Sequence, residues 1–112
     1  MKEDRVYLTH ILECIQRIED YTKGNKIHFK ESALIQDAVL RNLQIMAEST
    51  QHISDALRAD YPDVDWRAIS GFRNVLVNNY FGIDLDRVWE VIENRLQPLK
   101  QKTNMMLNNL PE

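Results

Sequence analysis

The sequence lacks the features that define several classes of protein. Its one cysteine, Cys14, can form no intrachain disulfide, and small secreted domains usually depend on disulfides, so we expect a reducing, cytoplasmic setting. Three glycines and three prolines are too few for a collagen-like or low-complexity chain. No apolar run approaches the roughly 18 residues of a membrane-spanning helix, and the charged opening residues do not resemble a signal peptide. We therefore expect a soluble protein with no membrane partner.

Basic residues are also in the minority, with 14 Lys and Arg against 17 Asp and Glu and a net charge of −3. This balance argues against a protein that coats nucleic acid broadly. The charge is unevenly spread, because Arg67 and Arg73 stand without an acid in residues 66–80, whereas four acids accompany only Arg87 in residues 84–93. A small, local phosphate site therefore remains compatible with the composition.

The rest of the composition is that of an ordinary globular chain. It has 112 residues, of which 44% are hydrophobic, and this length suits a single domain over residues 1–112. Apolar residues recur at three- and four-residue steps, which predicts helices over residues 4–22, 30–60 and 66–80, and a fourth that begins after Asp84 or Asp86.

A few residues are expected to separate these helices. Gly24 is a plausible left-handed stop for the first helix, and Pro62 ends the second. Asp65 is a natural N-cap for the third helix. Pro98 either opens a short fifth helix or kinks the fourth. The sequence thus predicts an all-α bundle of four to five helices.

The second predicted helix is long for a domain of this size. A straight helix over residues 30–60 would extend about 45 Å. A compact domain of this length has a diameter of roughly 26 Å. The helix must either bend or pack against another molecule, and a homodimer is the economical choice.

Most polar residues indicate no particular chemistry. The three histidines, at positions 10, 28 and 52, have no metal-ligand spacing, so we expect no metal site. One helix face carries residues spaced mostly four apart: Asp37, Arg41, Gln44, Glu48 and His52. A solvated, salt-bridged face is the favoured interpretation, and the lining of a cleft is the alternative.

The end of the third predicted helix is more distinctive, because it gathers polar residues of kinds that bind phosphate: Arg73, Asn74, Asn78, Asn79 and Tyr80. Arg73 and Tyr80 lie two turns apart and point the same way. Arg73 and Asn78 are about 7.5 Å apart along the axis, so a long Arg side chain could converge with Asn78 on one phosphate. An ordinary capped helix end fits the same spacing.

The segment RNVLVNNYFGID, residues 73–84, resembles the signature of HepT-like toxins, a branch of the HEPN superfamily. That signature is Arg, four residues, His, one residue and Tyr. The segments at residues 4–21, 36–49 and 65–74 are also similar to the family, so the resemblance covers nearly the whole chain.

The resemblance implies a HEPN-like homodimer that cuts RNA as a metal-independent endoribonuclease, with its cleft at the dimer interface and without a cofactor. Arg73 matches the family's catalytic Arg and Tyr80 its motif Tyr. The implied partner is an antitoxin, a minimal nucleotidyltransferase that silences the toxin by transferring AMP to the motif Tyr. Asn74, Asn79 and the helix face with Asp37, Arg41 and Glu48 become possible cleft-lining residues.

The chain departs from the signature at one position, because the motif His is Asn78. A histidine can move protons near neutral pH, whereas an amide cannot, so we expect impaired catalysis. Asn78 is either a deliberate substitution, since an active toxin kills its host, or the mark of a naturally silent paralogue. The intact remainder of the motif favours the first. The alternative functions are a non-catalytic helical adaptor that binds a nucleotidyltransferase and a structural dimer that does not contact RNA.

Overall fold

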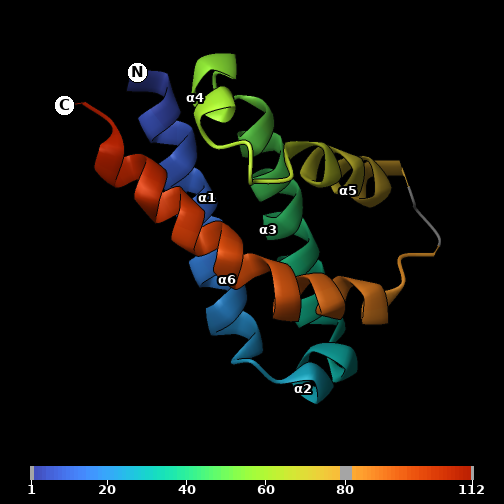
Figure 1. Cartoon of the computed structure of the whole chain (residues 1–112). Helices are drawn as coiled ribbons and strands as arrows, with labels where there is room; N and C mark the ends of the chain where they lie inside the picture. The colour runs from blue at the N-terminus through green and yellow to red at the C-terminus, as the bar shows by residue number, and fades with distance from the viewer. Residues whose placement is uncertain (1, 79–81, 112) are drawn as a thin grey trace.

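The computed structural model describes residues 2–78 and 82–111, and Figure 1 shows that this part of the chain is all-α. The helices are α1 (Lys2–Thr22), α2 (Lys26–Glu31), α3 (Ala33–Gln51), α4 (Asp55–Asp60), α5 (Trp66–Asn78) and α6 (Leu85–Asn109). The predicted all-α class is confirmed. The described residues form six helices rather than the predicted four or five. The additional helices, α2 and α4, have six residues each, and the sequence pattern did not separate them from the longer helices beside them.

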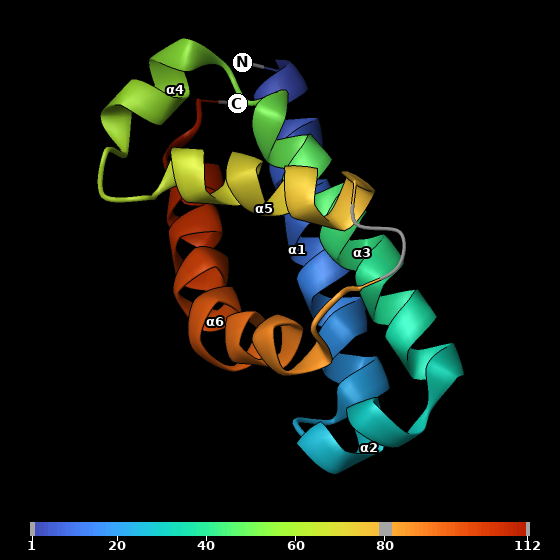
Figure 2. The same cartoon turned by 90° about the vertical axis from the view of Figure 1, so that its right-hand side faces the viewer.

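The hydrophobic core lies where α1, α3 and α6 meet (Figures 1 and 2). It is built from side chains that are almost completely buried: Leu8, Ile11, Ile15, Ile18, Val39, Leu43, Leu96 and Met106. Cys14 is part of the same cluster, and its burial raises the pKa of its thiol. A buried thiol with a raised pKa is a poor nucleophile, so Cys14 contributes to the core rather than to chemistry.

The turn after α1 contains Gly24 in the left-handed region, as predicted, with φ +68°. The following helix, α2, was not predicted. The side chain of Asn25 accepts a hydrogen bond from the backbone N–H of His28 at 3.1 Å and so caps α2. Phe29 of α2 packs on Trp89 of α6, with ring centroids 5.6 Å apart. The short helix therefore joins the α1–α3 pair to the start of α6.

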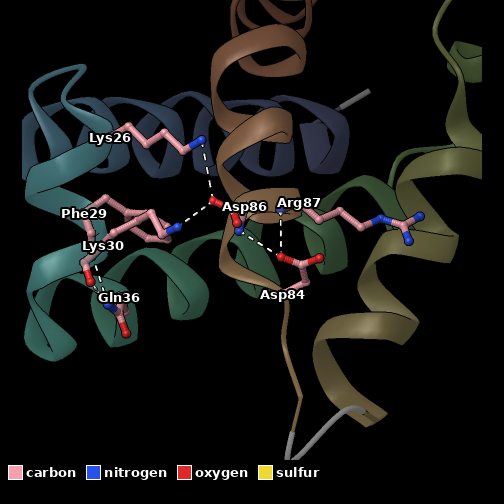
Figure 3. Close-up of polar contacts among 7 residues, drawn as sticks. All are labelled: Lys26, Phe29, Lys30, Gln36, Asp84, Asp86 and Arg87. Carbon is pink, nitrogen blue, oxygen red and sulfur yellow. Dashed lines mark hydrogen bonds and ion pairs between the residues drawn. The ribbon is translucent and has the colours of Figure 1, made fainter.

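Two lysines of α2 strengthen this attachment (Figure 3). The Nζ atoms of Lys26 and Lys30 lie 3.5 and 2.7 Å from the same carboxylate oxygen of Asp86. The hydrogen bond from Lys30 lowers the pKa of Asp86. All three side chains are largely exposed, so the contact contributes to the position of α2 more than to stability.

The prediction of one helix over residues 30–60 was wrong, because the chain bends at Ser32 and again after Gln51. Ser54 caps α4 by accepting a hydrogen bond from Leu57 N–H at 3.2 Å. Asp4 of α1, only 2% exposed, holds the bend by accepting hydrogen bonds from Ser54 N–H at 2.8 Å and Ser54 Oγ at 2.7 Å. The bend removes the helix-length argument for a homodimer.

The last helix, α6, is one continuous element with Pro98 inside it, so no fifth helix opens at this proline. Asp84 caps α6 by accepting hydrogen bonds from the backbone N–H groups of Asp86 and Arg87 at 3.0 and 3.4 Å. Figure 2 shows that α6 changes direction along its length. Pro98 has no N–H to bond the preceding turn, so a kink is the expected result. No helix in the described residues is long and apolar enough to span a bilayer.

Candidate active site

The helix that carries the signature residues, α5, is fixed at its first turn. The carboxylate of Asp65 accepts a hydrogen bond from Ala68 N–H at 2.9 Å, which confirms its predicted role as the cap. Trp66 Nε1 donates to Tyr61 O at 3.1 Å. Half-buried Ile69 and Phe72 face the core, and α5 crosses α3 (Figure 2). This crossing places Arg73 against the polar face of α3.

Arg73 is held by electrostatic attraction rather than by close hydrogen bonds. Its Nη2 atom lies 3.7 Å from Glu48 Oε1, and its Nη1 atom lies 3.5 Å from Asn74 Oδ1. Its Nε is buried and has no hydrogen-bond partner among the described residues. Because a guanidinium has five N–H donors, most of the donors of Arg73 remain uncommitted. With a side chain 32% exposed, Arg73 can accept an anion such as a phosphate oxygen.

The polar face of α3 reaches this site near the C-terminal end of the helix, through Glu48. Glu48 is half-buried and neutralises Arg73, so this residue is brought to the site. Asp37 and Arg41 are exposed, about 16 and 10 Å away along the helix from Glu48. Within residues 2–78 and 82–111, no ion pair or hydrogen bond joins either residue to Arg73. Glu48 thus pairs with Arg73, and a cleft-lining role stays a prediction for Glu48, Asp37 and Arg41.

The other signature positions are placed less completely. Asn74 is exposed beside Arg73. The backbone of α5 ends at Asn78, whose side chain is not among those described. Asn79 and Tyr80 lie outside the described residues. Their predicted roles therefore stay predictions.

The sequence pattern missed an aromatic cluster beside this site. Tyr7 of α1 stacks on His52 at the end of α3, with ring centroids 4.7 Å apart and planes 14° apart. His10 meets the ring of Tyr7 edge-on at 6.0 Å. The only local signal is the spacing of Tyr7 and His10, three residues apart on one helix, because the partner on α3 is distant in the sequence. No group of three or more metal-ligating side chains occurs in the described part of the chain.

A groove of about 870 Å³ separates α5 from α6. Its walls include apolar side chains of both helices: Ile69, Phe72, Val75, Leu76, Val88, Val91, Leu96 and Leu99. Val75 is 43% exposed although it is large and apolar. Arg87, Glu90 and Arg95 of α6 also line the groove, and Figure 3 shows Arg87 extended toward α5. Arg87, Glu90 and Arg95 form no ion pair with the residues that the structure describes.

The fold and the site define an all-α domain in which Arg73 of α5 pairs with Glu48 of α3. The sequence model of the family "Ribonuclease HepT-like" matches residues 11–106. The chain therefore belongs to the HepT-like ribonuclease family. No solved structure matches it significantly.

Curated relatives give a consistent result. A "Probable ribonuclease HepT" of Thermococcus cleftensis is 31% identical over 99 residues, which are 86% of this chain and 88% of the relative. A "Putative RNase" of Methanocaldococcus jannaschii is 28% identical and is aligned over 94% of this chain and 97% of its own length. A "Gamma-glutamylcyclotransferase and putative RNase" of the same organism is 34% identical over 97% of this chain, which spans only 50% of that longer protein.

Proposed function

We propose that this chain is the toxin of a toxin–antitoxin pair and acts in the cytoplasm as a metal-independent endoribonuclease. The observation that carries the proposal is the state of Arg73, which sits at the family's signature position with most donors uncommitted. In cleavage without metal, the 2′-hydroxyl attacks the adjacent phosphorus, loses its proton, and the bond to the 5′ oxygen breaks as that oxygen gains a proton. Arg73 would stabilise the extra negative charge on the phosphorane.

The residue that should move a proton in this reaction is replaced. Asn78 can hydrogen-bond a phosphate or a ribose but cannot act as acid or base near pH 7. General acid–base catalysis is worth about 10²–10⁴-fold in rate. We therefore propose that the chain binds RNA through Arg73 and cuts it slowly.

The active form is proposed to be a homodimer that covers the groove between α5 and α6. A second copy supplies the apolar surface that this groove leaves exposed, including Val75. The rim is also self-complementary, because in a two-fold pair Arg87 and Arg95 of one protomer can face Glu90 of its partner. Arg73 lies on the same helix but contacts Glu48 of α3 and does not line the groove, so a shared cleft with two Arg73 guanidinium groups is part of the proposal for the dimer.

The proposed control of this toxin is covalent. A nucleotidyltransferase antitoxin would transfer AMP from ATP to the hydroxyl of Tyr80, seven residues after Arg73 in the sequence, with release of pyrophosphate and of the hydroxyl proton. Each adenylyl group adds a negatively charged phosphate and bulk, which would occupy the donors of Arg73 and block the RNA phosphate. Mass spectrometry after incubation with the antitoxin and ATP should find the adduct on Tyr80 and none in Tyr80→Phe. An adduct elsewhere would refute this control and favour a different docking geometry.

The central experiment compares two arginines of the same helix. In the Asn78→His background, Arg73→Ala should abolish cleavage of single-stranded RNA in the presence of EDTA. The matched control is Arg67→Ala, which removes an exposed Arg from the first turn of α5 and should leave most of the activity. Equal losses in both variants would indicate a diffuse basic surface. Full activity in Arg73→Ala would contradict the proposed site.

A further inference from the structure

The aromatic cluster on the outer side of α1 and α3 has an arrangement that local packing alone does not require. Tyr7 is half-buried, whereas His10 and His52 are both exposed. The near-parallel rings of Tyr7 and His52 form a two-layer stack, with His52 as the outer, solvent-facing layer. One face of the His52 ring is thus supported by Tyr7, and a further flat ring could extend the stack on the side that faces solvent.

This stack lies next to the proposed phosphate site. Glu48, which pairs with Arg73, precedes His52 by four residues. Residues four apart on a helix are neighbours on one face, with Cβ atoms about 5–6 Å apart. His52 also keeps a right-handed helical conformation as the C-cap of α3, with φ −90° and ψ −5°. Glu48 and His52 therefore share one face of α3, and Glu48 links this face to Arg73 of α5.

We propose that His52, backed by Tyr7, is a stacking platform for one nucleobase of single-stranded RNA whose phosphate lies on Arg73. The proposal rests on the proposed function and adds a binding subsite to it. Single-stranded RNA is recognised largely by stacking of its unpaired bases on aromatic rings, while cationic groups bind the backbone. The stack of Tyr7 and His52 supplies the aromatic ring, and Arg73, which pairs with Glu48 one helical turn before His52, supplies the cation. His10 makes a T-shaped contact with Tyr7, the ring that backs His52.

The experiment measures binding of a short fluorescent oligoadenylate by anisotropy, with the chain as it stands. His52→Ala should weaken binding about 5- to 100-fold, the range expected for the loss of one stacked base. His52→Phe keeps a flat ring and should bind nearly as tightly as the unchanged chain. His28→Ala is the matched control, because His28 is an exposed histidine on α2, and it should have no effect.

A second oligonucleotide separates stacking from charge and from folding. In an oligoadenylate with abasic sites the phosphates remain and the bases are missing, so His52→Ala should change its binding little. Unaltered binding of the intact oligoadenylate by His52→Ala would overturn the platform. Equal weakening for both oligonucleotides, or failure of His52→Phe to bind, would also overturn it, because the role would then be electrostatic or structural.

The same titrations distinguish the platform from the function on which it rests. If Arg73→Ala weakens binding and His52→Ala does not, the platform is wrong and the proposed function stands. If the unchanged chain binds no RNA while its thermal unfolding is normal, both are wrong. Tyr7→Phe, which retains the stacked ring, should preserve binding and shows whether the tyrosine hydroxyl is needed.

Discussion

The interface between α1 and α3 is closely packed, whereas the space between α5 and α6 is open. Where α1 meets α3, side chains such as Ile11, Ile15 and Leu43 are at most 1% exposed. Where α5 faces α6, an open groove of about 870 Å³ remains, and Val75 is 43% exposed on its wall. The first side is packed as densely as a protein interior. The second leaves apolar side chains exposed, as surfaces that bind another molecule do.

This difference separates the part of the chain that stabilises the fold from the part that carries the signature residues. Arg73 and Asn78 belong to α5, the helix on the open side, whereas the packed interface of α1 and α3 contains neither of them. A site on the less completely packed side can be completed by a second protomer and by a substrate. The closed side holds α3 in place, and α3 provides Glu48, which pairs with Arg73 of α5.

The comparison is tested most strongly by removing apolar volume from each side. Leu43→Ala in the closed core should destabilise the protein by about 2–5 kcal/mol, because a cavity remains. Val75→Ala should cost well under half as much in the isolated protomer, because its side chain already contacts solvent. Urea unfolding at low protein concentration measures both. Equal costs would show that the groove is closed in solution.

A charge placed in the groove tests what covers it. Val75→Asp should weaken self-association by about 100-fold or more, since an unpaired carboxylate would be buried between protomers. Val6→Asp on α1 is the control, because Val6 is 51% exposed and lies outside the groove. Light scattering over a concentration series gives the association constant. A stable monomer of the unchanged chain at micromolar concentration would exclude the proposed dimer.

On the closed side, a polar contact can be removed without changing the core. Asp4→Asn should cost about 1–3 kcal/mol, because a buried charged acceptor of two hydrogen bonds from Ser54 is replaced by an amide. Asp55→Asn, at an exposed position in the first turn of α4, should cost less. Denaturant titration compares them. A negligible effect of Asp4→Asn would mean that the bend after Gln51 is held by Ser54 alone.

The smallest effect is expected at the exposed contact between α2 and α6, where Lys30 pairs with Asp86. Folding lowers the pKa of Asp86 through its hydrogen bond from Lys30, so this carboxylate stabilises the fold above its unfolded pKa of about 4. The contribution is lost as the pH falls through the lowered folded pKa. Asp86→Asn should therefore destabilise slightly at pH 7, and this effect should fade as the pH falls through the lowered folded pKa. Glu31→Gln provides an exposed control on the same helix as Lys30.

Local chemistry allowed much of this fold to be predicted from the sequence. The extent of α1, the left-handed Gly24, and the caps at Asp65 and Asp84 all follow from residues within a few positions of each helix end. The bend after Gln51 could not be predicted in this way, because Asp4, 50 residues earlier, provides the bonds that fix it. Helical periodicity continued through the bend and hid it.

In the candidate site, too, some features could be predicted from the sequence and others could not. Arg73 was found by its resemblance to the family signature, and the polar face of α3 was found by its spacing. The ion pair between Arg73 and Glu48 and the stack of Tyr7 on His52 both join different helices. Such pairings depend on how the helices cross, which periodicity does not specify.

The most direct test of the central claim is the rate at which Asn78→His cleaves single-stranded RNA in EDTA, relative to the unchanged chain. We predict an increase of about 10²–10⁴-fold, the contribution of general acid–base catalysis, and no cleavage at a 2′-deoxy linkage. A folded Asn78→His protein that cleaves RNA no faster than the unchanged chain would contradict the ribonuclease assignment for this molecule.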